Sequence, residues 1–111
     1  MALDDDGRLL ALEAMVAEDP DNELALFSLG QVLFERSNYA AAQEAFARAC
    51  LLQPDLMMAH LRRGECLVRL KRLVEAQKCL ESARDLAIAQ NHTGPRGDAD
   101  DLLEEIADEL D

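Results

Sequence analysis

Aromatic residues are scarce in this sequence, and tryptophan is missing altogether. Only 4% of the residues are aromatic although 50% are hydrophobic, so leucine and alanine must supply most of any core. Alanine, leucine, glutamate, glutamine and arginine lose little conformational freedom in a helix, whereas strands favour β-branched and aromatic residues. The composition therefore favours an all-helical chain, and 111 residues are enough for one small domain.

Long apolar stretches are also lacking. No run approaches the roughly 18 residues that span a bilayer, and the start of the chain has no basic region followed by an apolar stretch, as a secretory signal would have. The three cysteines are an odd number without close spacing, which is typical of reduced thiols. We therefore expect a cytoplasmic protein with no membrane partner.

Basic residues are few. The chain has 11 of them against 23 acidic residues, which gives a formal net charge of −12 at pH 7. Such a charge repels nucleic acid, and no aromatic residues are interleaved with the basic ones for base stacking. The charge is uneven, because residues 98–111 hold eight acids and no base, while seven of the 11 basic residues lie between Arg62 and Arg84. We expect no nucleic-acid partner.

Residue sets that could carry out chemistry are missing as well. No Cys-x2-Cys motif pairs with another, and no nucleotide fingerprint or phosphate loop occurs. His60 and His92 are isolated, with no base and nucleophile pattern around them. The three cysteines, Cys50, Cys66 and Cys79, fall in expected helices, where buried thiols fill a core. We predict no enzyme activity, no metal site and no cofactor.

What the sequence does contain is a repeat with a period of 34 residues. This period is the length of a helix–turn–helix repeat unit. In each copy two apolar stripes with helical spacing are separated by a short polar break, and Pro54 ends the first copy because proline lacks an amide donor. The matched pairs are Pro20 and Pro54, Asp21 and Asp55, Ala25 and Ala59, Gly30 and Gly64, Leu33 and Leu67, Ala42 and Ala76, Gln43 and Gln77, and Ala49 and Ala83.

The repeat predicts about six helices in one domain. Helical pairs are expected at residues 23–56 and 57–90, with an N-terminal helix at 3–19. A C-terminal helix at 98–110, after a loop at 93–97, would cap the open end. The small residues have a packing reason. Gly30 should face Ala42 across the first hairpin and Gly64 should face Ala76 across the second, with Phe46 and Leu80 filling the space beyond.

These residues resemble the tetratricopeptide repeat, whose pattern is W-x2-L-G-x2-Y in the first helix and A-x3-F in the second, followed by proline. The resemblance covers about 23–90 and implies a right-handed array of antiparallel helix–turn–helix repeats. The first unit reads Leu26-x2-Leu29-Gly30-x2-Leu33, then Ala42-x3-Phe46 and Pro54. The second reads His60-x2-Arg63-Gly64-x2-Leu67, then Ala76-x3-Leu80, with no closing proline.

The resemblance also implies a binding site. In such repeats the first helices line a concave groove for partner peptides, so the chain is expected to be a non-catalytic module that binds another protein or peptide. This face is expected to be apolar because of five side chains off the core stripe, namely Phe27, Phe34, Met58, Leu61 and Val68. An exposed apolar face marks an interaction site. The groove positions are Leu24, Phe27, Gln31, Phe34 and Glu35 in the first unit, and Met58, Leu61, Glu65, Val68 and Arg69 in the second.

Some relatives grip the C-terminal carboxylate of chaperones with lysine, asparagine and arginine at fixed groove positions. Here Phe27 and Gln31 hold those positions, with Arg62 in the next helix. We therefore predict no binding to an acidic chaperone tail.

Alternatives to a simple scaffold remain open. An end helix or a second copy can cover the apolar face, which would make the chain a self-assembling structural dimer. The second unit also looks like the last repeat of bacterial type III secretion chaperones for translocators, which implies a chaperone for a hydrophobic secreted protein. That likeness lies in Arg63-Gly64-Glu65-Cys66-Leu67, followed by Glu75-Ala76 and Leu80-x2-Ala83-Arg84.

The basic cluster also allows two interpretations. It docks an acidic segment of a partner, or it is a solvated face that the acidic C-terminal helix of this or another copy partly neutralises. Its members are Arg62, Arg63, Arg69, Lys71, Arg72 and Lys78.

Overall fold

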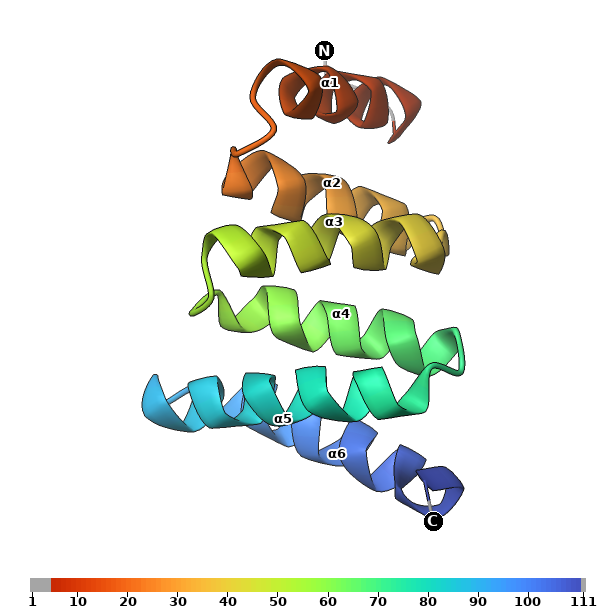
Figure 1. The fold of residues 1–111 in the computed structure, drawn as a ribbon, viewed down its shortest axis with the longest axis vertical. Helices are drawn as coiled ribbons and strands as arrows, with labels where there is room; N and C mark the ends of the chain where they lie inside the picture. The colour runs from red at the N-terminus through yellow and green to blue at the C-terminus, as the bar shows by residue number, and fades with distance from the viewer. Residues whose placement is uncertain (1–4, 111) are drawn as a thin grey trace.

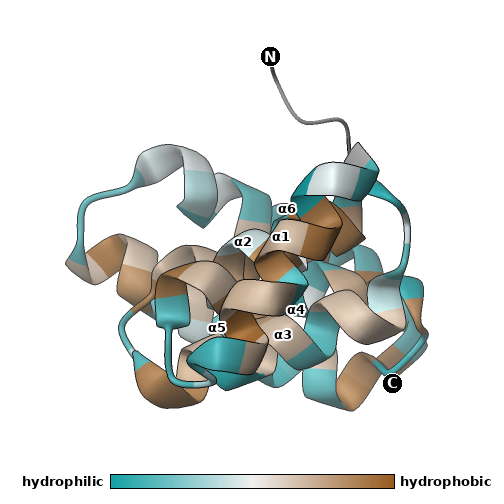
Figure 2. Cartoon of the chain, turned by 90° about the horizontal axis from the view of Figure 1, so that it is seen from above, coloured by the Kyte–Doolittle hydropathy of each residue, from teal (hydrophilic) through white to brown (hydrophobic). Residues whose placement is uncertain are grey.

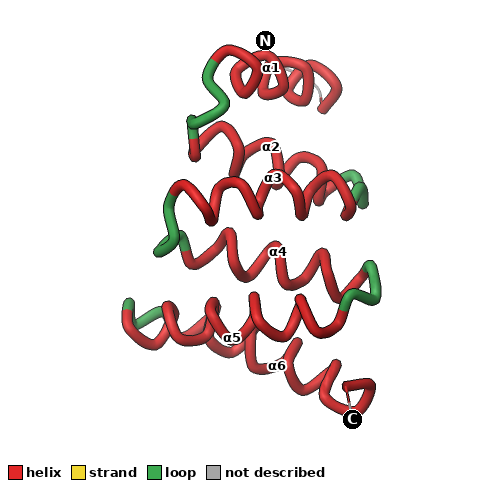
Figure 3. The backbone as a smooth tube through the Cα atoms, in the orientation of Figure 1, coloured by secondary structure: helices red, strands yellow, loops and turns green. Residues whose placement is uncertain are grey.

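The computed structural model describes residues 5–110, which form six α-helices and no strand. The helices are stacked one after another along an axis of 45 Å, with the two ends of the chain at opposite ends of the stack (Figure 1). The connections are short and alternate between the two sides of the stack, so successive helices run antiparallel (Figure 3). The expected all-α array of helical hairpins is confirmed. The helices are α1 (Asp5–Glu18), α2 (Glu23–Glu35), α3 (Tyr39–Leu52), α4 (Met57–Arg69), α5 (Leu73–Ala89) and α6 (Thr93–Leu110).

Three of the connecting turns share the same backbone conformation. Ser37, Lys71 and Asn91 have φ angles of 61°, 62° and 59°, in the left-handed region. The residue after each donates its amide to the carbonyl five residues back, at 2.8–2.9 Å. These bonds satisfy carbonyls that the end of a helix leaves unpaired. Helices α2, α4 and α5 therefore end in the same way, and each turn directs the chain back along the helix before it.

Proline decides the difference in length between the second helices of the two repeats. Helix α3 has 14 residues and ends before Pro54, whereas α5 has 17 residues. Ile88 stands 34 positions after Pro54 and can continue a helix, so α5 extends past the point where α3 stops.

The C-terminal helix begins earlier than expected, so the loop expected at 93–97 is wrong. Helix α6 starts at Thr93, with Pro95 as its third residue. Proline is tolerated in the first turn of a helix because its missing amide would have no partner there. The amide of Arg96 donates to the carbonyl of His92 at 3.1 Å and closes this turn.

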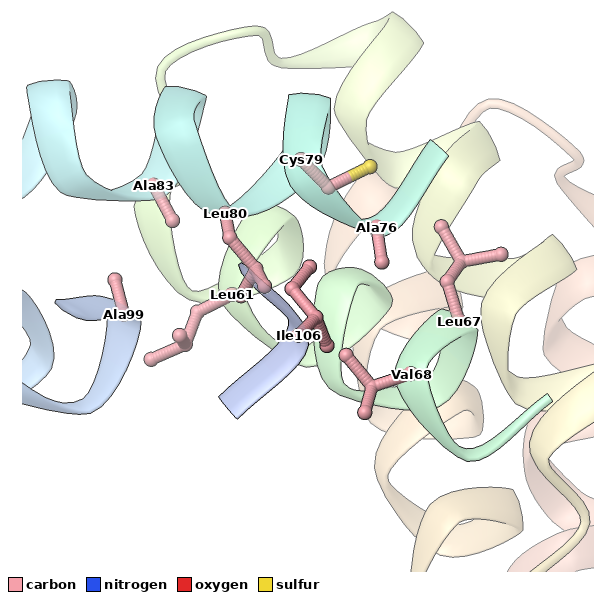
Figure 4. Close-up of a cluster of buried hydrophobic side chains, with 9 residues drawn as sticks. All are labelled: Leu61, Leu67, Val68, Ala76, Cys79, Leu80, Ala83, Ala99 and Ile106. Atoms are coloured by element: carbon pink, nitrogen blue, oxygen red, sulfur yellow. The ribbon is translucent and has the colours of Figure 1, made fainter. Parts of the chain in front are cut away.

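The core consists of two clusters that follow the repeats. One lies between α2, α3 and α4 and the other between α4, α5 and α6, where Ile106 of α6 sits among Leu61, Val68 and Leu80 (Figure 4). Apart from Phe46, both clusters are built from small and aliphatic side chains, as the composition requires. The first contains Leu26, Ala42, Phe46, Ala49, Cys50, Ala59 and Cys66, and the second contains Leu61, Leu67, Val68, Ala76, Cys79, Leu80, Ala83, Ala99 and Ile106.

Each repeat glycine packs directly against the bulky side chain that was expected to fill the space beyond the facing alanine. A Cβ atom at Gly30 would lie 2.6 Å from the ring of Phe46, and one at Gly64 would lie 2.7 Å from Leu80. Both bulky residues are fully buried. The expected closeness of the hairpins is therefore correct, but its purpose is to seat Phe46 and Leu80 against a bare backbone.

Helix α1 is attached more loosely than the others. No side chain from Asp6 to Glu18 is buried, and Leu10 is 68% exposed. Two ion pairs join it to the end of α2, between Arg36 and Asp6 and between Arg8 and Glu35. Among residues 5–110 no helix combines the length and the apolar character that crossing a bilayer needs.

Candidate partner-binding face

Helices α2, α4 and α6 share one side of the array. The guanidinium of Arg62 on α4 lies 5.6 Å from the centre of the Phe34 ring on α2, which links the first two of these helices. Helices α4 and α6 together line a cavity of about 300 Å³, which links the second and third. We call the accessible side chains on this side the α2–α4–α6 face. Figure 2, which views the stack from above, shows hydrophilic and hydrophobic residues alternating around the helices, as amphipathic helices require.

The positions expected on α2 are accessible to different degrees. Leu24 is 67% exposed and Glu35 is exposed, whereas Phe27, Gln31 and Phe34 are half-buried. Both phenylalanine rings also pack on other aromatic rings. Phe27 lies 5.5 Å from the buried Phe46, centre to centre, and Phe34 lies 5.6 Å from Tyr39. Each ring is thus anchored on one side and accessible on the other.

The positions expected on α4 divide into two groups. Met58 and Glu65 are half-buried and Arg69 is exposed. Leu61 and Val68, which were expected on an exposed apolar face, are only 1% and 6% exposed. They belong to the core cluster beneath α6 (Figure 4). Their expected exposure is corrected for a simple reason: the C-terminal helix packs on α4 and covers them.

Arg62 is a prominent member of this face that the expected set omits. One nitrogen of its guanidinium, Nη1, donates to Glu65 Oε1 at 3.0 Å, while its central carbon, Cζ, lies over the Phe34 ring. A cation is favoured both by the face of an aromatic ring and by a carboxylate. Arg62 therefore ties α2 to α4 across the middle of the face.

Helix α6 contributes three further residues that the expected set omits. Asp98, Asp101 and Leu102 line the cavity together with Arg62 and Glu65. The spacing of three between the two aspartates places them on one side of a helix. The spacing of these two aspartates can be seen in the sequence. It did not indicate a site, because the sequence does not show that α6 packs beside α4, in the position that the first helix of a third repeat would occupy.

Three of the six residues of the basic cluster, Arg62, Lys71 and Arg72, are neutralised by a nearby carboxylate. Arg72 donates two hydrogen bonds to Glu75, at 3.0 and 2.8 Å, and these bonds lower the pKa of that exposed carboxyl group. Lys71 lies 3.8 Å from Glu109 of the acidic C-terminal helix. These contacts favour the interpretation of a solvated face over that of an acidic docking site.

A larger cavity of about 390 Å³ lies between α1, α2 and α3. Two of its lining residues, Leu26 and Leu33, stand where the repeat pattern has tryptophan and tyrosine. Leucine is smaller than either aromatic residue, so the space beneath α1 is not filled. Its lining consists of Leu9, Glu13, Leu26, Leu29, Leu33, Asn38, Ala41, Glu44, Ala45 and Arg48.

The cysteines are buried thiols. Burial raises the pKa of Cys50 to about 11 and that of Cys66 to about 12, and it also raises the pKa of Cys79. Near neutral pH all three are therefore uncharged, and a thiol is a much weaker nucleophile and metal ligand than a thiolate. Within residues 5–110 no three histidine, cysteine, aspartate or glutamate side chains gather in a group that could hold a metal ion.

Antiparallel helical hairpins with a 34-residue period, stacked so that the first helices share one side, define the class of tetratricopeptide-type repeat proteins. Folds of this class are typical of protein–protein interaction. The sequence matches the family model described as anaphase-promoting complex, cyclosome, subunit 3, over residues 4–83. The chain belongs to this family. No curated protein sequence matches it significantly.

Several solved structures are similar to the whole array. One is PcrH in complex with the chaperone binding region of PopD, with a TM-score of 0.84 and 23% identity over 93% of this chain and 78% of that one. Another is the first TPR of Spaghetti (RPAP3) bound to the HSP90 peptide SRMEEVD, with a TM-score of 0.79 and 21% identity over 93% and 80%. A third is MamA, with a TM-score of 0.65 and 19% identity over 90% and 65%. At these identities the likeness is one of fold.

Proposed function

We propose that this chain is a non-catalytic interaction module that binds a segment of a partner protein on the α2–α4–α6 face. The observation that carries the proposal is the apolar surface left accessible there. Leu24 is 67% exposed, and Phe27, Phe34 and Met58 are half-buried. Covering such surface stabilises a complex by about 25 cal/mol per Å² removed from water, before the cost of ordering the partner.

Each expected groove residue has a part in this proposal. The apolar side chains of α2 and of Met58 contact the partner, and the polar side chains beside them, Gln31, Glu35, Glu65 and Arg69, select among partners. Leu61 and Val68 act from beneath, because they hold α6 against α4 and so fix the third helix of the face.

Two of the similar structures support a protein or peptide as the ligand. PcrH is in complex with a region of PopD, and the first TPR of Spaghetti is bound to a peptide. The likeness to PcrH also supports a second candidate, a chaperone for a hydrophobic secreted protein, because the second repeat resembles such chaperones at Arg63-Gly64-Glu65-Cys66-Leu67. Co-expression separates the two functions: a chaperone keeps an otherwise insoluble partner in solution, whereas a scaffold leaves its solubility unchanged.

The test is affinity capture from lysate of the source cells with three forms of the protein. The first is wild type and the second is Leu24→Glu, which places a charge on the face. The third is Leu51→Glu, a matched control on α3 where the leucine is 83% exposed. A partner that the wild type and Leu51→Glu capture, and that Leu24→Glu loses, supports the proposal.

A partner that all three forms retain would argue against this face as the site. Light scattering over a dilution series tests the remaining alternative, a self-assembling dimer. If the wild type is a stable dimer and Leu24→Glu is a monomer, a second copy covers the face and the partner is the chain itself.

A further inference from the structure

We propose that the α2–α4–α6 face selects partner segments carrying a lysine or arginine next to an apolar residue, and that this basic side chain enters the cavity between α4 and α6. The inference rests on the proposed function and names the chemistry of the partner. It gives the two ends of the face different roles, with apolar contacts on α2 and charge recognition on α6.

The cavity has the size and lining for one long side chain. Its volume of about 300 Å³ is at the lower end of the range for ligand sites. Leu102 provides an apolar wall for the methylene groups, while Asp98 and Asp101 provide carboxylates for the charged end. Lysine and arginine have this division between an apolar stem and a charged head.

The charge of the cavity is not balanced from within. Arg62 and Glu65 form an ion pair at 3.0 Å and cancel one another. Among the described residues, no lysine or arginine nitrogen lies within 4 Å of a carboxylate oxygen of Asp98 or Asp101. Two carboxylates therefore face the cavity without a cation, and a partner's basic side chain would supply the missing charge.

An existing contact of the face, which does not involve the two aspartates, points the same way. The face already holds one guanidinium, because Arg62 lies between the Phe34 ring at 5.6 Å and the Glu65 carboxylate. An aromatic ring and a carboxylate at this spacing favour a cation on electrostatic grounds. A basic side chain arriving beside Leu102 would extend an arrangement that the protein already uses for its own arginine.

The net charge of the molecule disfavours an acidic partner segment. The net charge is −12, and eight of the 23 acids lie in residues 98–111, which include the two cavity aspartates. Such a field raises the association rate of cationic segments and lowers that of anionic ones. An acidic segment such as SRMEEVD, which is bound in the similar Spaghetti structure, would meet like charge here.

The experiment begins with a random 12-residue peptide library displayed on phage and selected on the wild type, with Leu24→Glu as the counter-selection. The expected consensus joins apolar residues with a lysine or arginine at a fixed spacing. An enriched peptide is then synthesised, and its affinity is measured by fluorescence anisotropy on the wild type and on two double variants. Asp98→Asn/Asp101→Asn alters the cavity. Asp100→Asn/Asp108→Asn removes the same two charges at exposed positions of α6 outside the cavity lining.

The expected result is a loss of about tenfold in affinity for the cavity variant and of about twofold or less for the control. The cavity aspartates contact the bound basic side chain directly, whereas the control aspartates act on it only from a distance, where salt screens them. Circular dichroism verifies that both variants are folded. Equal losses of affinity in the two variants would mean that binding depends only on the net charge of the protein and not on the cavity aspartates. That result would overturn the inference. Apolar peptides without a basic preference, or acidic peptides, would also overturn it and leave the proposed function intact. If no peptide is enriched over Leu24→Glu, the proposed function fails as well.

Discussion

At the scale of single residues, two glycines determine how the hairpins close. Gly30 and Gly64 stand in the middle of α2 and α4, where glycine costs a helix about 1 kcal/mol relative to alanine. Each nevertheless provides the space into which a fully buried Phe46 or Leu80 packs. The large side chain gains more from this contact than the helix loses, because a well-packed core leaves no other space for it.

This balance predicts opposite signs for the same substitution at different glycines. Gly30→Ala should lower the free energy of unfolding by about 1–3 kcal/mol despite the better helix former, because the new methyl group would overlap the Phe46 ring. Gly97→Ala, in α6 with no atom within 4 Å of the new methyl group, should raise it by about 0.5–1 kcal/mol. Urea denaturation measures both. Adding Phe46→Leu to Gly30→Ala should recover part of the loss, and a stabilising Gly30→Ala would contradict the packing argument.

The buried thiols predict a pH dependence. The pKa of Cys50 is raised from 9.0 to about 11, so the unfolded chain releases this proton at lower pH than the folded one. The contribution of the protonated Cys50 thiol to folding stability is therefore complete below pH 9. The free energy of unfolding should fall as the pH rises from 9 to 11. A Cys50→Ala/Cys66→Ala/Cys79→Ala variant should show a shallower fall over the same range in urea titrations.

The same burial predicts slow modification at neutral pH. A thiol-specific disulfide reagent should react with the folded protein at least about tenfold more slowly than with the urea-unfolded chain, since modification must wait for opening. Immediate reaction of any of the three cysteines would place that thiol at the surface.

At the scale of helices, the 34-residue period and its punctuation were sufficient to predict α2 to α5. The C-terminal helix was expected as well, but its start was placed at residue 98, whereas α6 begins at Thr93. Gly94 and Pro95 were interpreted as a loop, although proline breaks a helix only in its interior and not in its first turn. A sequence pattern fixes which side of a helix is apolar, but it does not say which neighbour covers that side.

The errors in predicting the site arise because the sequence does not show which neighbouring helix covers an apolar side. Leu61 and Val68 have the spacing of an exposed apolar face, and they became core residues only because α6 packs over them. Asp98 and Asp101 were expected only as part of an acidic capping helix, and they line a cavity because that helix lies next to α4. Positions of α2, such as Leu24, were placed more accurately, because no further helix covers them.

The packing of α6 predicts a strong effect from its single buried large side chain. Ile106 is 1% exposed and contacts the second core cluster, so Ile106→Ala should cost about 2–4 kcal/mol through lost burial and the cavity left behind. The exposed neighbouring residue provides the control, and Glu105→Ala should change stability by about 0.5 kcal/mol or less. Thermal unfolding followed by circular dichroism measures both variants. Equal midpoints for Ile106→Ala and the wild type would mean that α6 is not part of the cooperative core.

At the scale of the whole molecule, the array is close to one-dimensional. Each helix packs mainly on its neighbours in the chain, and α4 also contacts α6. Stability in such an array is a sum of local terms, so the two ends need not be equally firm. The C-terminal end is closed by Ala99 and Ile106, which are buried, whereas the N-terminal end has no buried side chain from Asp6 to Glu18.

This asymmetry predicts a gradient of backbone protection. Hydrogen exchange followed by mass spectrometry should find α1 exchanging first and α4 and α5 last, because local opening is easiest where few apolar contacts must break. The ion pairs of Arg36 with Asp6 and of Arg8 with Glu35 are exposed, so added salt should screen them and speed exchange in α1 further.

The Arg36→Gln variant isolates the electrostatic part of this attachment. It should speed exchange in α1 at low salt, leave α4 and α5 unchanged, and remove most of the salt effect, because the packing of Val16 against the first core cluster remains in place. Uniform protection from α1 to α6, in the wild type and the variant alike, would show that the array opens as one unit. The contacts of α1 would then contribute as much to stability as the buried core. The stability of this stack of helices could then no longer be described as a sum of local terms.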